Sequence, residues 1–189
     1  MNREQLRHAI SAASEVSGDH ELYVFGSQAI LGEHPDAPDA VRVSVEVDIQ
    51  PKNHPERVDV VDGALGEGSP FADTHKFYVH GVSIEAAVLP RGWEGRVRKL
   101  PGAYPNEAAL GLCLDLHDVA ASKLAAFREK DRGYIEVLLR EHLLSLPKLR
   151  SRFALIDDAR LPAEKRDICE RWLTATWKNL QMRRGSADG

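Results

Sequence analysis

The chain has 189 residues, of which 43% are hydrophobic and 29% charged, and its formal net charge is −4. This length suits one compact unit, of one or two lobes, and the composition excludes a broadly disordered chain. The sequence has no apolar run near the roughly 20 residues of a membrane-spanning helix, and its two cysteines form no disulfide framework.

The N-terminal segment, residues 2–16, has apolar side chains at helical spacing with charges between them. It lacks the long apolar stretch and the cleavage site of a secretory signal. We therefore expect a helix here and a cytoplasmic protein.

The charge is unevenly distributed, because residues 143–189 contain ten Lys or Arg and six Asp or Glu. Such a basic segment can attract a polyanion, with the cations at Arg150, Arg152, Lys165, Arg166, Arg171 and Lys178 contacting phosphates. An ordinary solvated helical surface accounts for the same pattern equally well.

The first half of the chain predicts strands joined by turns. Residues 22–25 read as a short buried strand, followed by the Gly26-Ser27 turn and a short helix over 28–31. Residues 41–49 alternate at period two, which predicts a strand with valines on one face and Arg42, Ser44, Glu46 and Asp48 on the other.

The rest of the chain predicts a change from mixed to helical structure. A helix is expected over 56–65, and residues 76–80 and 82–88 suggest a hairpin around Gly81. From residue 118 onward the apolar spacing is helical. The predicted fold is α/β (α+β), with a small mixed-sheet core over residues 1–115 and a helical lobe over 116–189 packed on that core.

Two of these features suit a bound metal and phosphate. A Gly-Ser turn at a helix N-terminus offers unpaired N–H groups to phosphate oxygens. The Glu46 and Asp48 carboxylates on one strand face repel each other unless a cation intervenes, and Mg²⁺ commonly binds through one or two carboxylates and substrate phosphates.

Gly26-Ser27 and Glu46-Val47-Asp48 resemble the signature of the nucleotidyltransferase superfamily, a Gly-Ser after the first strand and an acidic-x-acidic pair on the next. Within this superfamily the chain resembles the AbiEii/MenT-like toxin branch of bacterial toxin–antitoxin systems more closely. That branch has an Asp-x4-Lys element, matched by Asp118 and Lys123, and a basic-acidic element, matched by Arg128 to Asp131. The resemblance covers roughly residues 20–140.

The resemblance implies a role for each matched residue. Glu46 and Asp48 would hold two Mg²⁺ ions, and Gly26 and Ser27 would hold the triphosphate together with Ser44 on the acidic strand face. Glu85 would be a third carboxylate that deprotonates the acceptor, unless it is a surface residue. The second-half residues expected to contact nucleotide or to act in catalysis are Asp118, Lys123, Arg128, Lys130 and Asp131, with a helix-capping role as the alternative for Asp118 and Asp131.

The implied activity is transfer of a nucleoside monophosphate from an NTP to an acceptor hydroxyl. The resemblance further implies tRNA as acceptor, growth arrest as outcome and a cognate antitoxin as partner. One alternative is transfer to a protein or small molecule, and another is a degenerate protein that binds nucleotide or a partner without catalysis. We expect neither sequence-specific DNA reading nor membrane association.

Overall fold

The computed structural model describes residues 1–185, and the chain divides into two compact units. The first unit comprises residues 1–87 and 92–119, and the second comprises residues 88–91 and the chain from residue 120 onward. The change from one unit to the other therefore falls inside a helix, α5 (Leu116–Ala126).

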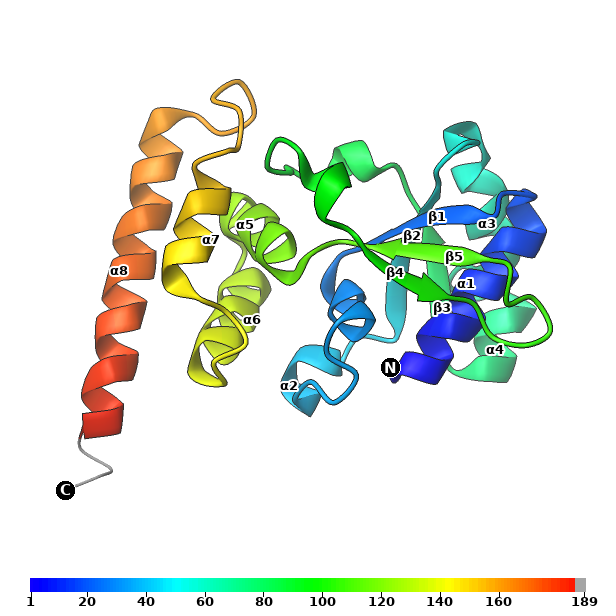
Figure 1. Ribbon diagram of the computed structural model, residues 1–189, viewed down its shortest axis with the longest axis horizontal. Coiled ribbons are helices and arrows are strands. Elements are labelled where there is room, and N and C mark those ends of the chain that lie inside the picture. Colours follow the sequence, from blue (N-terminus) through cyan, green and yellow to red (C-terminus); the bar gives the residue numbers. More distant parts are fainter. Residues whose placement is uncertain (186–189) are drawn as a thin grey trace. The chain divides into compact units, whose positions relative to one another are not determined.

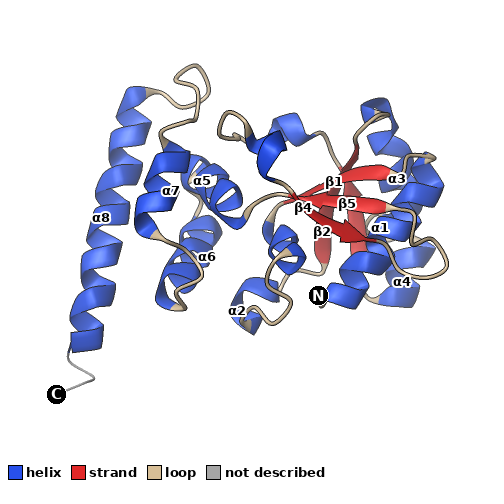
Figure 2. Ribbon diagram, viewed as in Figure 1, coloured by secondary structure: helices blue, strands red, loops and turns tan. Residues whose placement is uncertain are grey.

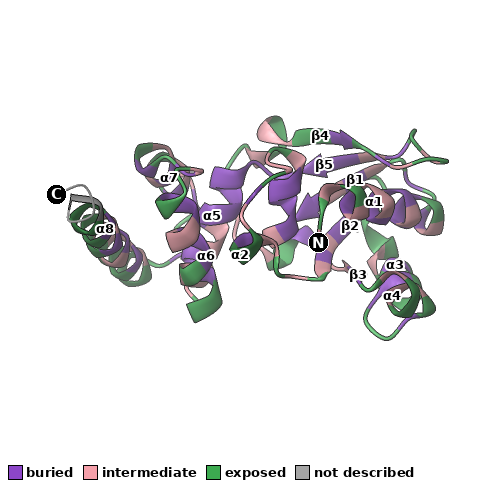
Figure 3. Ribbon diagram, turned by 90° about the horizontal axis from the view of Figure 1, so that it is seen from below, coloured by how far each residue is buried: buried purple, intermediate pink, exposed green. Residues whose placement is uncertain are grey.

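The first unit is built on a five-stranded mixed sheet with the strand order β3-β2-β1-β5-β4 (Figures 1 and 2). The β1–β2 and β4–β5 pairs are antiparallel, whereas the β1–β5 and β2–β3 pairs are parallel. Burial is greatest toward the middle of the sheet, since β5 is largely buried and the edge strand β4 is mostly exposed (Figure 3). The strands are β1 Glu21–Phe25, β2 Glu46–Pro51, β3 Tyr78–Gly81, β4 Arg98–Pro101 and β5 Leu110–Cys113.

Two helices of the first unit, α1 (Arg3–Ser17) and α3 (Val58–Leu65), pack against this sheet. The first of them, α1, begins with a capping box. The Asn2 side-chain oxygen accepts a hydrogen bond from the backbone N–H of Gln5, and the Gln5 side-chain oxygen accepts one from the backbone N–H of Asn2. Its buried face includes Leu6, Ala9 and Ile10. The α-helices are α1 Arg3–Ser17, α2 Asp39–Arg42, α3 Val58–Leu65 and α4 Pro70–His75, and the 3-10 helices are η1 Ser27–Gly32, η2 Pro55–Arg57, η3 Ile84–Ala86 and η4 Trp93–Arg96.

The second unit is helical. The Cys169 thiol, buried on α8, contacts the Leu124 carbonyl of α5 at 3.2 Å, and Arg150 of α7 bonds Thr174 of α8 at 2.7 Å. Within residues 1–185, no helix is both long and apolar enough to cross a bilayer. The further helices are α6 Glu129–Arg140, α7 Leu146–Phe153 and α8 Ala163–Gly185.

The predicted α/β class, with a small mixed sheet and a helical C-terminal region, is confirmed. Two local predictions are wrong. The alternating segment is a strand only from Glu46, since α2 occupies Asp39–Arg42 and Val43 is 76% exposed. Residues 82–88 contain the 3-10 helix η3 rather than the second strand of a hairpin, and β3 instead pairs in parallel with β2.

The side chain of Asp19 fixes the end of the β1–β2 pair remote from Gly26. Its buried carboxylate accepts bonds from the amides of Glu21, Asn53 and His54 and from the Asn53 side chain. Burial alone would raise the pKa of Asp19, but these hydrogen bonds lower it below its usual value. The start of β1 and the loop after β2 are thereby held together, which fixes the register of the two strands.

Candidate functional site

Glu46 and Asp48 project from the same face of β2, because alternate residues of a strand share a face. The antiparallel pairing places Asp48 opposite Phe25, the last residue of β1. The side chains are partly accessible, with exposed fractions of 39% for Glu46 and 24% for Asp48. Both carboxylates can therefore reach a ligand from solvent.

Gly26 follows β1 directly and lies against Asp48. Its backbone has φ 66° and ψ −158°, a region that is essentially restricted to glycine. A Cβ built on Gly26 would lie 2.1 Å from Oδ2 of Asp48, so only glycine lets the carboxylate approach the turn this closely. The predicted Gly26-Ser27 turn and the acidic pair thus lie side by side.

His80 and Tyr78, which the sequence analysis did not select, complete this cluster from β3. The parallel β2–β3 register pairs Glu46 with Tyr78 and Asp48 with His80. Nδ1 of His80 is 3.0 Å from Oδ1 of Asp48 and 3.4 Å from Oε1 of Glu46, and the Tyr78 hydroxyl donates to Oε2 of Glu46 at 2.8 Å. One ligand atom from each of Glu46, Asp48 and His80 lies within 4.8 Å of the others, which suits a divalent cation.

The electrostatics of the cluster favour a positive charge. Burial and then the neighbouring Glu46 raise the pKa of Asp48 to about 6, although the hydrogen bond from His80 opposes the rise. Burial would lower the pKa of His80, but the hydrogen bond to Asp48 and the two carboxylates raise it overall. The hydrogen bond to Glu46, together with burial, raises the pKa of Tyr78 to about 12, so the phenol stays a donor.

The raised pKa of Asp48 predicts a pH-dependent stability in metal-free buffer. Folding favours protonated Asp48, so its contribution is present below the unfolded pKa near 3.8 and is lost as the pH rises through about 6. Asp48→Asn removes this penalty, so its stability advantage over wild type should grow by roughly 1–2 kcal/mol as the pH rises from about 4.5 to about 7.5. Urea unfolding of both proteins with chelator present measures this gain, and a constant difference across the range would show that the Asp48 charge is not penalised.

Three other residues predicted for this site are placed as follows. Ser27 begins η1 directly after Gly26. The Ser44 hydroxyl binds the backbone of Glu46, two residues further on, accepting from its amide at 3.1 Å and donating to its carbonyl at 3.2 Å. Glu85 lies exposed on η3 and is not a member of the cluster found among residues 1–185, whose third member is His80.

We compared the whole chain with known protein families. The model of a family described as nucleotidyltransferases of unknown function (DUF6036) matches residues 4–183. The chain belongs to this family. No curated protein and no solved structure matches it. The nucleotidyltransferase superfamily that the sequence predicts is therefore supported, at the level of this DUF6036 family.

In this DUF6036 chain, Asp118 forms an internal ion pair in the first unit. Its fully buried carboxylate accepts from Nε of Arg96 at 2.7 Å and from Nη2 of Arg96 at 3.0 Å. The N-cap of α5 is Asp115, whose Oδ1 accepts from the His117 amide at 3.0 Å. The capping alternative for Asp118 is therefore wrong. The ion pair with Arg96 gives Asp118 a structural role.

Lys123 and Asp131 form an ion pair in the second unit. Nζ of Lys123 donates to Oδ1 of Asp131 at 3.1 Å and lies 4.8 Å from the centre of the Tyr134 ring. Nε of Arg128 is 3.5 Å from Oδ2 of Asp131, and Lys130 is exposed. Asp131 lies in the first turn of α6, whose N-cap is Arg128. Its carboxylate pairs with the Lys123 ammonium and does not act as an N-cap. The structure brings together the predicted basic-acidic element and Lys123.

Gln28, the residue after Ser27, has a fully buried amide whose nitrogen and oxygen both lack a hydrogen-bond partner among the described residues. Leaving such groups unpaired costs about 1–3 kcal/mol. Gln28→Met keeps the shape and removes the polar atoms, so we expect a gain of about 1–2 kcal/mol in unfolding free energy, measured with urea. A loss of stability would show that the amide is hydrogen-bonded in solution.

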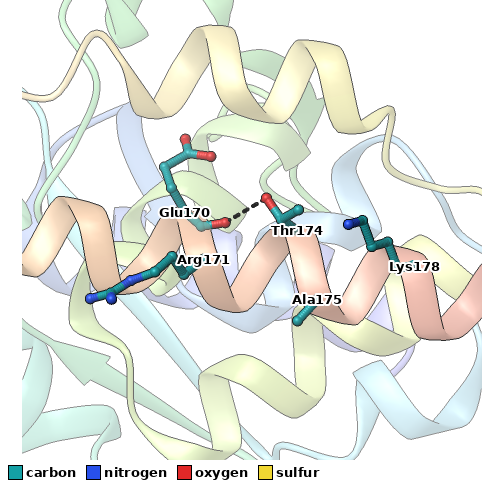
Figure 4. A pocket seen from close by; sticks show the side chains of 5 residues that line it. All are labelled: Glu170, Arg171, Thr174, Ala175 and Lys178. Atoms are coloured by element: carbon teal, nitrogen blue, oxygen red, sulfur yellow. Dashed lines mark hydrogen bonds between the residues drawn. The ribbon is translucent and has the colours of Figure 1, made fainter.

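A hollow on α8 contains none of the predicted site residues. It is lined by Glu170, Arg171, Thr174, Ala175 and Lys178, all from one face of the helix, and the Thr174 hydroxyl bonds the Glu170 carbonyl (Figure 4). None of the five described residues that line this hollow is a buried polar side chain.

Proposed function

We propose that this chain transfers a nucleoside monophosphate from an NTP to an acceptor hydroxyl and releases pyrophosphate. The family supports the general class of reaction. The observation that supports the proposal most is the approach of Gly26 to Asp48, because it puts the Gly26-Ser27 turn directly beside the carboxylate cluster. In the reaction the acceptor hydroxyl loses its proton and its oxygen bonds to the α-phosphorus, while the bond from that phosphorus to the bridging oxygen breaks and pyrophosphate leaves with the electron pair.

We assign each residue of the cluster a separate role in this reaction. Glu46, Asp48 and His80 would hold a divalent metal ion, which supplies charge stabilisation for the phosphate oxygens. Mg²⁺, in two copies, is the expectation from the resemblance. Tyr78 orients Glu46 by donating to one of its oxygens, which leaves the other oxygen facing His80. Gly26 and Ser27 would position the triphosphate beside these groups.

The turn gives a further prediction for this activity. Gly26→Ala places a Cβ on top of Oδ2 of Asp48 and a side chain at positive φ, so Asp48 must move. We expect the transfer rate to fall by about 100-fold, since a shift near 1 Å in a catalytic group has that effect. Gly95→Ala is the matched control, because its Cβ meets nothing within 4 Å. Equal rates in the two variants would refute the proposed role of the turn.

We propose tRNA as the acceptor and a toxin role with a cognate antitoxin, on the strength of the AbiEii/MenT-like motifs alone. The surface charge adds little support, since several of the C-terminal cations are already paired. Arg150 pairs with Glu170, Arg171 with Asp167, and Arg166 with Asp158 and the Phe153 and Ile156 carbonyls. Transfer to a protein or small molecule uses the same site and is the second candidate.

Labelling with α-³²P NTPs distinguishes these acceptors. The purified protein is incubated with each NTP in turn, with total tRNA or with cell protein, and the Asp48→Asn variant is run beside it. Label on tRNA that the variant fails to add supports the first candidate, and label on protein supports the second. Nucleotide binding without any transferred label would favour a non-catalytic binder.

A further inference from the structure

The cluster on β2 and β3 differs from an all-oxygen magnesium site in one ligand. Two carboxylates, Glu46 and Asp48, face one imidazole, His80, and the three ligand atoms lie within 4.8 Å of one another. The nitrogen is directed at the carboxylates, since Nδ1 of His80 lies 3.0 Å from Asp48 and 3.4 Å from Glu46. A cation bound by both carboxylates would therefore lie within reach of this nitrogen as a ligand.

The backbone, rather than chance side-chain placement, puts the imidazole there. The parallel register pairs Asp48 directly with His80 and Ile49 with Gly81. Gly81 in turn is fixed to α3, because its amide donates to Oδ1 of Asp62 at 3.2 Å. His80 thus sits on a paired strand next to the acidic pair, with a side chain that is 44% exposed and able to leave room for water or phosphate ligands.

The donor set decides which ions bind well. Mg²⁺ prefers oxygen ligands and strict octahedral geometry, whereas imidazole suits first-row transition ions. Mn²⁺ shares with Mg²⁺ the preference for carboxylate oxygens and octahedral coordination, but as a first-row transition ion it tolerates a nitrogen ligand better than Mg²⁺ does. Between Mn²⁺ and Mg²⁺, a mixed set of two carboxylates and one imidazole therefore favours Mn²⁺.

We propose that this site binds Mn²⁺ in preference to Mg²⁺, and that His80 Nδ1 is the ligand that sets the preference. The inference deepens the proposed function, on which it rests, by naming the metal of the same site. Glu46 and Asp48 bind either ion, and His80 makes the site bind Mn²⁺ more tightly than Mg²⁺. Replacing His80 with aspartate gives an all-oxygen set and should shift the preference toward Mg²⁺.

The test measures metal binding without nucleotide. The free Mn²⁺ signal in electron paramagnetic resonance is followed as the protein is titrated, and Mg²⁺ is then added as competitor. We expect the Mn²⁺ over Mg²⁺ preference to fall by about tenfold or more in His80→Asp, as expected for loss of a nitrogen ligand. His54→Asp is the control, because His54 is an exposed histidine that contacts Glu56 outside the cluster. This control should keep the wild-type preference.

A second readout uses the wild-type protein and does not depend on the variant folding. Bound Mn²⁺ should show electron spin-echo modulation from an imidazole nitrogen, a signal that a merely structural His80 would not give. Mn²⁺ binding without nitrogen coupling, no Mn²⁺ binding at all, or an unchanged preference in His80→Asp would overturn the inference.

Assays of nucleotidyl transfer with each ion separate this inference from the proposed function. Nitrogen-coupled Mn²⁺ without transfer of any nucleotide supports the metal assignment and rejects the activity. Transfer that runs equally well with Mg²⁺ and Mn²⁺, with no nitrogen coupling, supports the activity and rejects the metal assignment.

Discussion

Asp48→Asn is expected to lower kcat/KM for nucleotidyl transfer by about 1,000-fold or more, because bound metal supplies several kcal/mol of charge stabilisation to phosphate. Asp48 is central to the cluster, since its carboxylate contacts both His80 and the Gly26 turn. The amide that replaces it keeps the shape and can still accept from His80, but it lacks the charge that attracts a cation. Steady-state kinetics on the purified variant, with the best NTP and acceptor, measure the loss.

The matched control for this variant is Asp59→Asn, on the exposed face of α3. It makes the same chemical change, from carboxylate to amide, and should leave the transfer rate within about twofold of wild type, as surface changes usually do. The metal-free stability of Asp48→Asn should be equal to or above that of wild type, for the electrostatic reason given with its pKa. A slow variant that is also poorly folded would therefore not fit this explanation.

Asp118→Ala is expected to destabilise the protein by about 3–5 kcal/mol, because it removes one partner of a buried ion pair and deprives the Arg96 guanidinium of this carboxylate. The carboxylate is fully buried and the Arg96 side chain is only 20% exposed. For a chain of this size the loss corresponds to a fall in Tm of roughly 6–20 °C. Differential scanning calorimetry in metal-free buffer measures it.

Asp39→Ala provides the comparison, because Asp39 pairs with Arg42 through a side chain that is 97% exposed. An exposed pair contributes about 0–1 kcal/mol, so this variant should unfold close to the wild-type temperature. If Asp118→Ala unfolds like Asp39→Ala but loses NTP affinity, the structural role assigned to Asp118 is wrong and the nucleotide-binding role implied by the resemblance gains support.

The sequence was sufficient for the features that depend on local chemistry. Residues 22–25 form a strand because they are apolar and aromatic between turn residues, and the Gly26-Ser27 turn follows as predicted. The two carboxylates share a face because they are two residues apart on a strand. The alternation over residues 41–45 was misleading, because period-two valines also occur where a short helix leads into an extended segment with Val43 and Val45 exposed.

Long-range pairing limited the rest of the prediction. His80 joins the site only because β3 pairs in parallel with β2, and the register between two strands separated by α3 and α4 has no local signal. A usable hint was present, since Tyr78 and His80 are two residues apart and share a strand face, as Glu46 and Asp48 do. The strand β5 was missed because Leu110–Cys113 is short and contains a glycine, and its pairing with β1 and β4 decides its conformation.

Pyrophosphate release is the most direct measurement of the central claim, that the cluster of Glu46, Asp48 and His80 beside Gly26 is a nucleotidyltransferase site. Wild type and Asp48→Asn are incubated with a divalent metal ion, each NTP and a cell extract as the source of acceptor, and pyrophosphate is quantified over time. The structure and the family predict metal-dependent release by the wild type with at least one NTP and none above background by the variant. No release by the wild type with any NTP, or equal release by the two proteins, would contradict the claim.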